Sequence, residues 1–300
     1  MTQARLGLTL GPVLFLWDEA RWRDFYFRMA DEGEVDTVVL GEVVCSKRDH
    51  FHLASMPEII DRLTAAGKTV RLATLGLVTL ERERKSVRKL AEQEDYEVEV
   101  GELSAVAALA GKPHAVGPLV NVYNAATAKV LAGKGATSIC LPPELPVSSI
   151  QTIVRGTPGM AFEVFAFGRV PLAISARCAH ARIKGLTKDN CQFVCGSDPD
   201  GLPVDTLDDQ QFLALNGVQT MSSTCLSLLG DVASLRAAGV DSLRLSPQVC
   251  DMVEVARLFR AAADGAIGPI EAMARLGRAY PDMRFSNGFF HGVAGHEFVA

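Results

Sequence analysis

The sequence predicts an α/β protein that folds into a closed, barrel-like parallel sheet surrounded by helices. Short runs rich in apolar and β-branched residues alternate with segments of helical periodicity, which is typical of βαβ units. Helical stripes are clear in two segments, one formed by Trp22, Phe25 and Met29 and the other by Met252, Val255 and Phe259. The runs that predict strands are residues 6–10, 36–40, 69–73, 96–100, 119–122, 136–140, 161–165 and 242–245.

Eight such runs favour a closed barrel, and an open doubly wound sheet is the alternative. The length of 300 residues suits one domain, because α/β barrels commonly run to about 250 residues. We therefore expect a single domain over residues 1–300. The interval 169–224 does not fit one helix and contains three of the seven cysteines. It is predicted to be an insertion, with a turn-rich loop at residues 196–201.

Charge and hydropathy limit the partners and the compartment. The 30 Lys and Arg against 35 Asp and Glu give a net charge of -5, which argues against a nucleic-acid partner. The apolar stretch 6–17 is interrupted by Gly11 and Pro12, so it predicts a strand and its loop and not a signal peptide. No apolar run reaches the roughly 18 residues of a spanning helix. We expect a cytoplasmic protein without stable membrane insertion.

The cysteines are the residues that point to chemistry. Without a secretion signal, thiols are metal ligands, reactive groups or core residues more often than disulfide partners. Cys140 and Cys225 lie in apolar runs and fit ordinary buried thiols. Cys178, Cys191 and Cys195 lie in a polar segment, and the spacing of the last two predicts one helical turn that aims both sulfurs at one point. These three predict a metal site.

A thiolate site of this kind needs a fourth ligand, and the local pattern leaves two candidates open. Cys45 and Cys250 both follow a predicted strand, at the end where barrel enzymes build their sites. Structural zinc usually shows two close cysteine pairs, whereas this chain has one close pair and scattered partners. The pattern therefore favours an iron-sulfur cluster over zinc, with nearby Arg and Lys side chains available to balance its negative charge.

Four motifs together resemble the collagenase-like peptidase (U32) superfamily along essentially the whole chain. They are residues 41–48 (GEVVCSKR), 175–180 (SARCAH), 191–195 (CQFVC) and 216–222 (NGVQTMS). The resemblance is to the branch that serves oxygen-independent ubiquinone biosynthesis. It implies a 4Fe-4S cluster on Cys45, Cys178, Cys191 and Cys195, and a role in ring hydroxylation as a heterodimer with a homologous subunit of the UbiU type. Because the quinone precursor is greasy and this chain lacks a basic amphipathic helix, we also expect a lipid-carrier protein to deliver it.

Several other residues are weaker candidates. His180 is expected either to donate a hydrogen bond to a cluster sulfur or to be exposed to solvent. Glu42, Lys47 and Arg48 lie at the predicted barrel mouth, where they could bind an acidic or phenolic substrate or be solvated.

Two rival functions remain open at this stage. The chain lacks nucleotide-binding, serine-hydrolase and zinc-peptidase motifs. We therefore expect a component of a hydroxylase complex that transfers electrons, and not a peptidase. The rivals are a peptidase of the superfamily and a non-catalytic partner whose cluster is purely structural.

Overall fold

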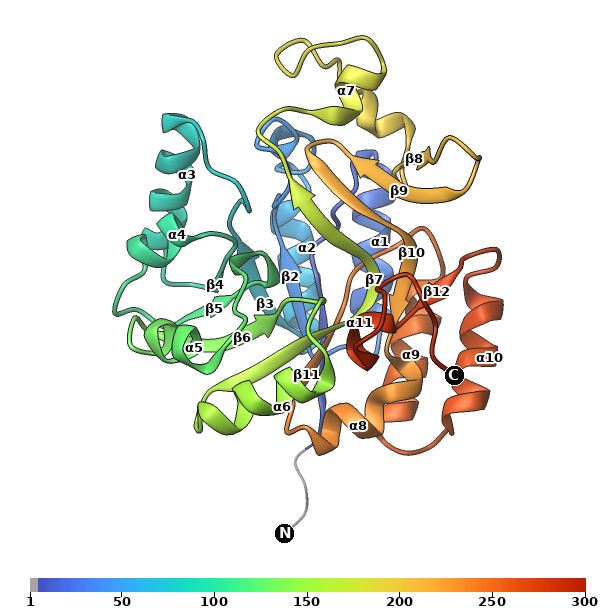
Figure 1. Ribbon diagram of the computed structural model, residues 1–300. Coiled ribbons are helices and arrows are strands. Elements are labelled where there is room, and N and C mark those ends of the chain that lie inside the picture. Colours follow the sequence, from blue (N-terminus) through green and yellow to red (C-terminus); the bar gives the residue numbers. More distant parts are fainter. Residues whose placement is uncertain (1–4) are drawn as a thin grey trace.

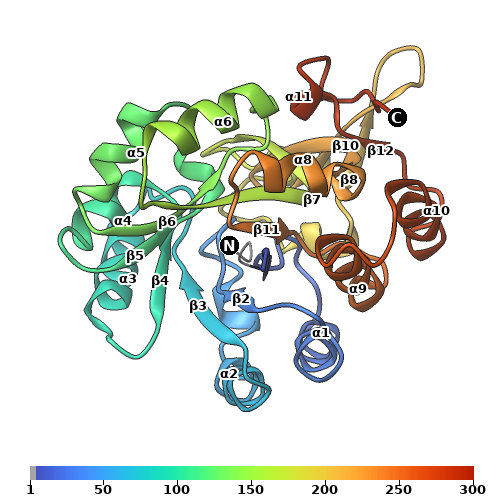
Figure 2. The ribbon, with the colours of Figure 1, turned by 90° about the horizontal axis from the view of Figure 1, so that it is seen from below.

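The computed structural model describes residues 5–300 and contains a closed barrel of eight parallel strands. The ring closes because the last barrel strand pairs with both the first strand and the seventh. Figure 2 shows the strands around one axis with helices outside them. The barrel strands are β1 Gly7–Leu10, β2 Thr37–Leu40, β3 Thr69–Ala73, β4 Glu97–Val100, β5 His114–Val116, β6 Ala136–Leu141, β7 Ala161–Ile174 and β11 Ser242–Leu245. The predicted barrel fold is confirmed.

Helices between the strands cover the outside of the barrel. Each of the two stripes predicted from the sequence forms a helix, and Trp22 and Met29 of the first and Met252, Val255 and Phe259 of the second are buried. The helices are α1 Glu19–Asp31, α2 Met56–Ala65, α3 Glu81–Glu92, α4 Leu103–Ala108, α5 Ala125–Ala132, α6 Val147–Gly156, α7 Ala179–Ile183, α8 Val232–Ala237, α9 Met252–Ala263, α10 Pro269–Ala279 and α11 Gly288–His291. Their apolar faces and the strands share one hydrophobic core.

One predicted strand is wrong. The fifth barrel strand is His114–Val116, and the predicted run 119–122 begins instead with a 3-10 turn, Pro118–Val120. A strand of three residues gives almost no periodic signal. The run after it looks β-rich in sequence, but Pro118 fixes its own backbone, and Asn121 adopts a left-handed conformation with φ 62°.

The segment between β7 and α8 extends beyond the barrel. The second half of β7 pairs with β10 Gln219–Ser227, which continues antiparallel into β9 Gln211–Asn216 and β8 Leu202–Asp205. The short strand β12 Phe285–Ser286 pairs with the edge of β10 that faces away from β7. Figure 1 places α7, β8 and β9 together beyond the end of the barrel opposite the N-terminus. Since β1 begins at the N-terminal end, this segment covers the carboxyl ends of the barrel strands.

The barrel interior contains a closed ionic cluster. Arg244 on β11 donates through Nη1 to Glu99 on β4 at 2.8 Å and through Nε to Glu163 on β7. All three side chains are at most 5% exposed. Burial raises the pKa of Glu163, but the charges of Arg244 and Arg71 and the hydrogen bonds to this carboxylate together lower it more, so this pKa lies below its ordinary value. Both carboxylates therefore share one guanidinium within the barrel.

Within residues 5–300, no helix has the length and apolar character required to cross a membrane.

Candidate functional site

Four cysteines distant in sequence line one pocket at the carboxyl end of the barrel. They are Cys45, Cys178, Cys191 and Cys195, and Lys47, Arg48, Lys188, Phe193, Val194 and Gly217 complete the lining. Cys45 belongs to the loop after β2, whereas the other three belong to the segment between β7 and β8. The pocket thus lies where the barrel meets the covering segment.

The β2 loop is shaped to present Cys45. Gly41 has a φ of +124°, and a Cβ there would lie 2.9 Å from the carbonyl oxygen of Ala73, so a side chain is excluded. The carboxylate of Glu42 then accepts the backbone N–H groups of Val44 at 2.6 Å and Cys45 at 2.9 Å. Glu42 therefore fixes the turn that carries Cys45.

The other three cysteines are presented by short, irregular elements. Cys178 is the N-cap of α7, and its sulfur accepts the N–H of Ala181 at 3.4 Å. Cys191 and Cys195 do not share an α-helical turn, so that prediction is wrong. Gln192 and Phe193 both have positive φ, at 48° and 52°, and this reverses the chain before a 3-10 turn, Val194–Ser197. The two sulfurs still reach one pocket, but through a tight left-handed turn.

Contacts across the pocket hold the β2 loop against the covering segment. Lys47 donates through Nζ to the backbone oxygens of Lys188 at 2.7 Å and Asp189 at 3.2 Å. The ring of Phe193 packs against Phe51 with a centroid distance of 4.8 Å. Both contacts lie beside a cysteine of the pocket. They fix the position of Cys45 relative to Cys191 and Cys195.

Arg48 is a buried cation at the base of this pocket. Its side chain is 1% exposed and donates to two neutral oxygens, the Leu14 carbonyl and Oδ1 of Asn216, each at 2.9 Å. Among residues 5–300 no carboxylate forms an ion pair with it. Burial lowers the pKa of Arg48, but Glu42 and the thiols of Cys195 and Cys45 raise it above its ordinary value. A negative charge in the pocket would therefore be stabilised by Arg48.

The pocket raises the pKa of two of its thiols, those of Cys45 and Cys195. Burial raises the pKa of Cys45, and Arg48 only partly offsets this. Burial also raises the pKa of Cys195, with Arg48 opposing it and the neighbouring Cys178 and Cys191 adding to it. Buried, protonated thiols are poor nucleophiles but become metal ligands when a metal displaces the proton. The pocket is suited to binding a soft metal group more than to thiolate catalysis.

His180 supports the pocket from behind. It is 0% exposed, so the expectation of a solvent-exposed histidine is wrong. Its Nδ1 accepts the N–H of Gly217 at 3.5 Å, and Nε2 then donates to Asp198 at 2.9 Å. Burial lowers the pKa of His180 and the hydrogen bond to Asp198 opposes this. No hydrogen bond from His180 to a sulfur is found in the described chain.

The sequence reasoning did not identify Asn216 and Gly217 as parts of the site. They form the turn between β9 and β10, and Gly217 has a φ of +61°. A Cβ at Gly217 would lie 2.5 Å from Nη2 of Arg48, so only glycine fits against the guanidinium. An Asn-Gly pair between alternating apolar residues is a strong hairpin signal and could have located this turn. The burial of Arg48 has no comparable signal in the sequence.

The three remaining cysteines lie elsewhere. Cys140 and Cys225 are buried in the core at 3% and 0% exposure. Cys250 lines a different pocket, with Trp17 and Met252, and its thiol contacts the sulfur of Met252 at 3.7 Å. Of the two candidates for a fourth ligand, Cys45 is the one beside the other three. Within the described chain, no three Cys, His, Asp or Glu side chains converge closely enough to hold a single metal ion.

Fold and site together define a single-domain α/β-barrel protein with a cysteine-lined pocket at the carboxyl end of its strands. The chain belongs to peptidase family U32, whose family model matches residues 26–299. This confirms the superfamily that the sequence motifs indicate.

Two solved structures match this chain with low sequence identity. A truncated 3-deoxy-D-arabino-heptulosonate 7-phosphate synthase from Thermotoga maritima is 10% identical over 93% of this chain and 91% of that chain, with a TM-score of 0.47. An enzyme of the GH138 class that targets pectin rhamnogalacturonan II is 8% identical over 93% of this chain and 41% of that chain, with a TM-score of 0.48. Neither similarity bears on the activity of this chain.

Proposed function

We propose that this chain carries a 4Fe-4S cluster on Cys45, Cys178, Cys191 and Cys195. The observation that carries the proposal is that four thiols line one pocket against Arg48, a buried cation that no carboxylate pairs within the described chain. A thiolate-ligated cluster has net negative charge, and a partly desolvated negative charge needs compensation. Arg48 and the pocket-lining Lys47 and Lys188 supply it.

The spacing of the thiols supports a cluster over a single ion. One zinc ion requires every sulfur at about 2.3 Å from a common point, and the described residues contain no group that converges in this way. In a four-iron cluster each cysteine binds its own iron, so the ligands surround the group and do not meet at one atom. Four thiols that line one pocket support the second arrangement.

We further propose that the chain is a UbiV-type subunit that acts in the cytoplasm in oxygen-independent hydroxylation of the ubiquinone precursor ring. A cluster with a cysteine on every iron supplies electron transfer and leaves no iron position free for substrate. A homologous UbiU-type subunit would then complete the reaction, and a lipid carrier would present the greasy precursor. The motifs at residues 41–48 and 191–195, which include three of the four cysteines, support this assignment.

The second candidate function is a peptidase activity, which the name of the family supports. The side-chain hydrogen bonds do not support it. A cysteine or serine peptidase needs a nucleophile hydrogen-bonded to a histidine. In the described residues no Ser, Thr or Cys side chain forms such a bond. His180, the histidine nearest to the cysteines in sequence, is bonded to Asp198 and Gly217.

The test is to purify the chain without air, alone and co-expressed with its homologous partner. Ultraviolet-visible and Mössbauer spectra with iron and sulfide assays should give four irons per chain. A hydroxylation assay on the separated and recombined subunits should show activity only when both are present. Full activity from this chain alone would contradict the partner. Peptide cleavage by iron-free protein would favour the peptidase, and unchanged hydroxylation after cluster removal would favour a purely structural cluster.

A further inference from the structure

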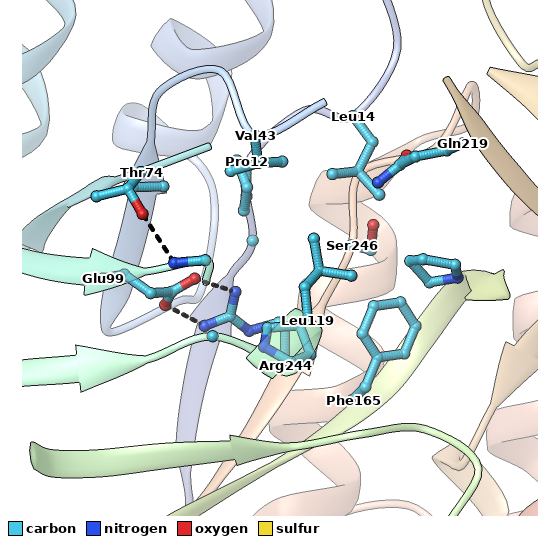
Figure 3. Close-up of a pocket in the computed structure, with 16 residues that line it drawn as sticks. Pro12, Leu14, Val43, Thr74, Glu99, Leu119, Phe165, Gln219, Arg244 and Ser246 are labelled. Atoms are coloured by element: carbon cyan, nitrogen blue, oxygen red, sulfur yellow. Dashed lines mark hydrogen bonds and ion pairs between the residues drawn. The ribbon is translucent and has the colours of Figure 1, made fainter. Parts of the chain in front are cut away.

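A second pocket lies at the mouth of the barrel and shares no lining residue with the cysteine pocket. Its total empty space is about 470 Å³, which includes open solvent and the gaps between lining atoms, so the enclosed part is much smaller. Apolar side chains form most of its wall: Pro12, Leu14, Val43, Leu119, Phe165 and Pro171. Figure 3 shows Leu14, Leu119 and Phe165 around the same space, with Gln219 and Ser246 at its edge. Pockets at this end of a barrel are the usual ligand sites of the fold.

Two polar groups of this pocket are buried without a partner. Gln219 is 0% exposed and Ser246 is 3% exposed. Neither Nε2 of Gln219 nor Oγ of Ser246 forms a hydrogen bond within the described chain. A buried donor without an acceptor costs about 1–3 kcal/mol, so such groups are rare unless a ligand or water completes them. Both line the same apolar space, which places two hydrogen-bonding groups there for a ligand.

The direction of the Gln219 amide is set by the network behind it. Arg48 has only donors, so Asn216 must present its oxygen to Nη2 of Arg48. The nitrogen of Asn216 then donates to the Leu14 carbonyl at 2.7 Å and to Oε1 of Gln219 at 3.3 Å. With its oxygen held on that side, Gln219 is left with Nε2 as a free donor. Arg48 lines the cysteine pocket, so this chain of hydrogen bonds joins the two pockets.

The charge at the floor of the pocket selects against anionic ligands. Arg244 and Glu99 both line it, and Arg244 is already bonded to Glu99 and Glu163. One guanidinium with two carboxylates has no positive charge to offer an anion. Both oxygens of Glu99 already accept from Arg244. The polar groups that remain available are the neutral Gln219 and Ser246.

We propose that this barrel-mouth pocket binds one uncharged ring that carries a phenol or ring-carbonyl oxygen. The oxygen accepts from Nε2 of Gln219 and exchanges a hydrogen bond with Ser246. The ring packs among Leu119, Phe165 and Pro171. The choice of a phenolic ring rests on the proposed function. The pocket and its two uncharged polar groups are observed independently of that function.

The test measures binding and needs no turnover. The purified 300-residue protein, prepared without air, is titrated with 2-propylphenol by calorimetry. Propylbenzene, which lacks the oxygen, and 2-hydroxybenzoate, which adds a negative charge, are titrated in the same way. We expect the phenol to bind more tightly than both. Gln219→Met should weaken phenol binding about tenfold, because a buried hydrogen bond is lost. Thr157→Val is the control, since Thr157 is also buried with an unpaired side-chain oxygen but lies outside this pocket.

Equal phenol affinity of wild type and Gln219→Met, tighter binding of the benzoate, or no phenol binding at millimolar concentration would overturn the proposal. Ser246→Ala is the second variant if Gln219→Met does not fold, and it should also weaken phenol binding. The titration is repeated on Cys191→Ser protein, which should hold no cluster. Phenol binding there, with no hydroxylation by any form, would refute the proposed function and leave this pocket standing. Full hydroxylation with Gln219→Met would refute the pocket and leave the function standing.

Discussion

Two buried arginines in this molecule have opposite electrostatic surroundings. Arg244 lies inside the barrel and is bonded to two carboxylates, those of Glu99 and Glu163. Arg48 lies under the cysteine pocket and is bonded to two neutral oxygens. Both side chains are at most 2% exposed. At the first site two carboxylates are bonded directly to the arginine, whereas Arg48 interacts with Glu42 without a hydrogen bond and would be stabilised further by negative charge in the pocket.

The difference separates a structural use of buried charge from a binding use. A buried ion needs a partner of opposite sign to offset its desolvation. In the barrel that partner is provided by neighbouring strands, so Arg244 serves the fold. At the cysteine pocket Arg48 is bonded only to neutral oxygens, and a bound metal group would deprotonate the thiols and supply negative charge beside it. The following substitutions test this distinction.

The largest effect is expected from the four pocket cysteines. Replacing any one of Cys45, Cys178, Cys191 or Cys195 by Ala should remove most of the iron, because an incompletely ligated cluster is labile. Iron assay and visible absorbance of anaerobically purified protein measure this loss. Circular dichroism should stay unchanged, and air should bleach the wild type without unfolding it, because the barrel core does not include the metal.

Cys250→Ala is the matched control, since Cys250 follows a barrel strand as Cys45 does but lines another pocket. Cys140→Ala and Cys225→Ala should also retain iron. Loss of iron from Cys250→Ala with retention in Cys45→Ala would show that the fourth ligand is assigned wrongly. Loss of helical circular dichroism on bleaching would show that the cluster is structural.

The second effect is on folding of the barrel. Arg244→Met leaves Glu99 and Glu163 buried without a cation, which should lower the free energy of unfolding by about 3–5 kcal/mol. Urea unfolding measures the change. Arg88→Met is the control, because its ion pair with Glu81 is exposed to solvent, and it should cost about 1 kcal/mol or less. Similar losses in the two variants would contradict the central role of Arg244.

The same cluster predicts a dependence of stability on pH. The folded-state pKa of Glu163 lies below its ordinary value because the charges of Arg244 and Arg71 and the hydrogen bonds to the carboxylate together outweigh the effect of burial. A lowered carboxyl pKa stabilises the fold above the unfolded value of about 4.3 and loses this contribution as the pH falls through the folded value. Wild-type stability should therefore fall more steeply below about pH 4 than that of a Glu163→Gln variant. Parallel acid unfolding curves would contradict this.

The periodicity of the sequence is sufficient to predict the barrel, but it is insufficient to predict how the cysteine pocket is built. Long strands such as β3 and β6 were found because apolar runs bounded by turns repeat along the chain, and β5 was missed because it has only three residues. The four cysteines could be named from motifs. Their presentation could not, because the left-handed turn at Gln192 and Phe193 follows no spacing rule. Nor could the burial of Arg48, which depends on a hairpin 168 residues away in sequence.

The third effect distinguishes Arg48 from Arg244. Arg48→Met removes two hydrogen bonds to neutral acceptors. In the described chain Arg48 forms no ion pair, so the substitution does not separate a carboxylate from a bonded cation. The iron-free protein should lose only about 1–2 kcal/mol of stability. In the iron-loaded protein the cluster loses its nearest buried cation, so a chelator should remove iron about tenfold faster. Arg48→Lys should retain iron better than Arg48→Met, because it keeps the charge. Equal iron release from wild type and Arg48→Met would mean that Arg48 serves the fold as Arg244 does.

The smallest effect comes from the glycine that packs on Arg48. Gly217→Ala meets two costs, a left-handed backbone at φ +61° and a Cβ placed 2.5 Å from Nη2 of Arg48. Gly111→Ala meets only the first, since Gly111 has φ +83° and no atom near its Cβ position. Each left-handed alanine should cost about 1–2 kcal/mol in urea unfolding. The difference in stability between the two variants measures the contact with the guanidinium. Arg48 can move away from the new Cβ only by lengthening its bonds to Leu14 and Asn216. Gly217→Ala should therefore also release iron faster, whereas Gly111→Ala should not. Equal iron release from both would show that Arg48 can move without disturbing the pocket.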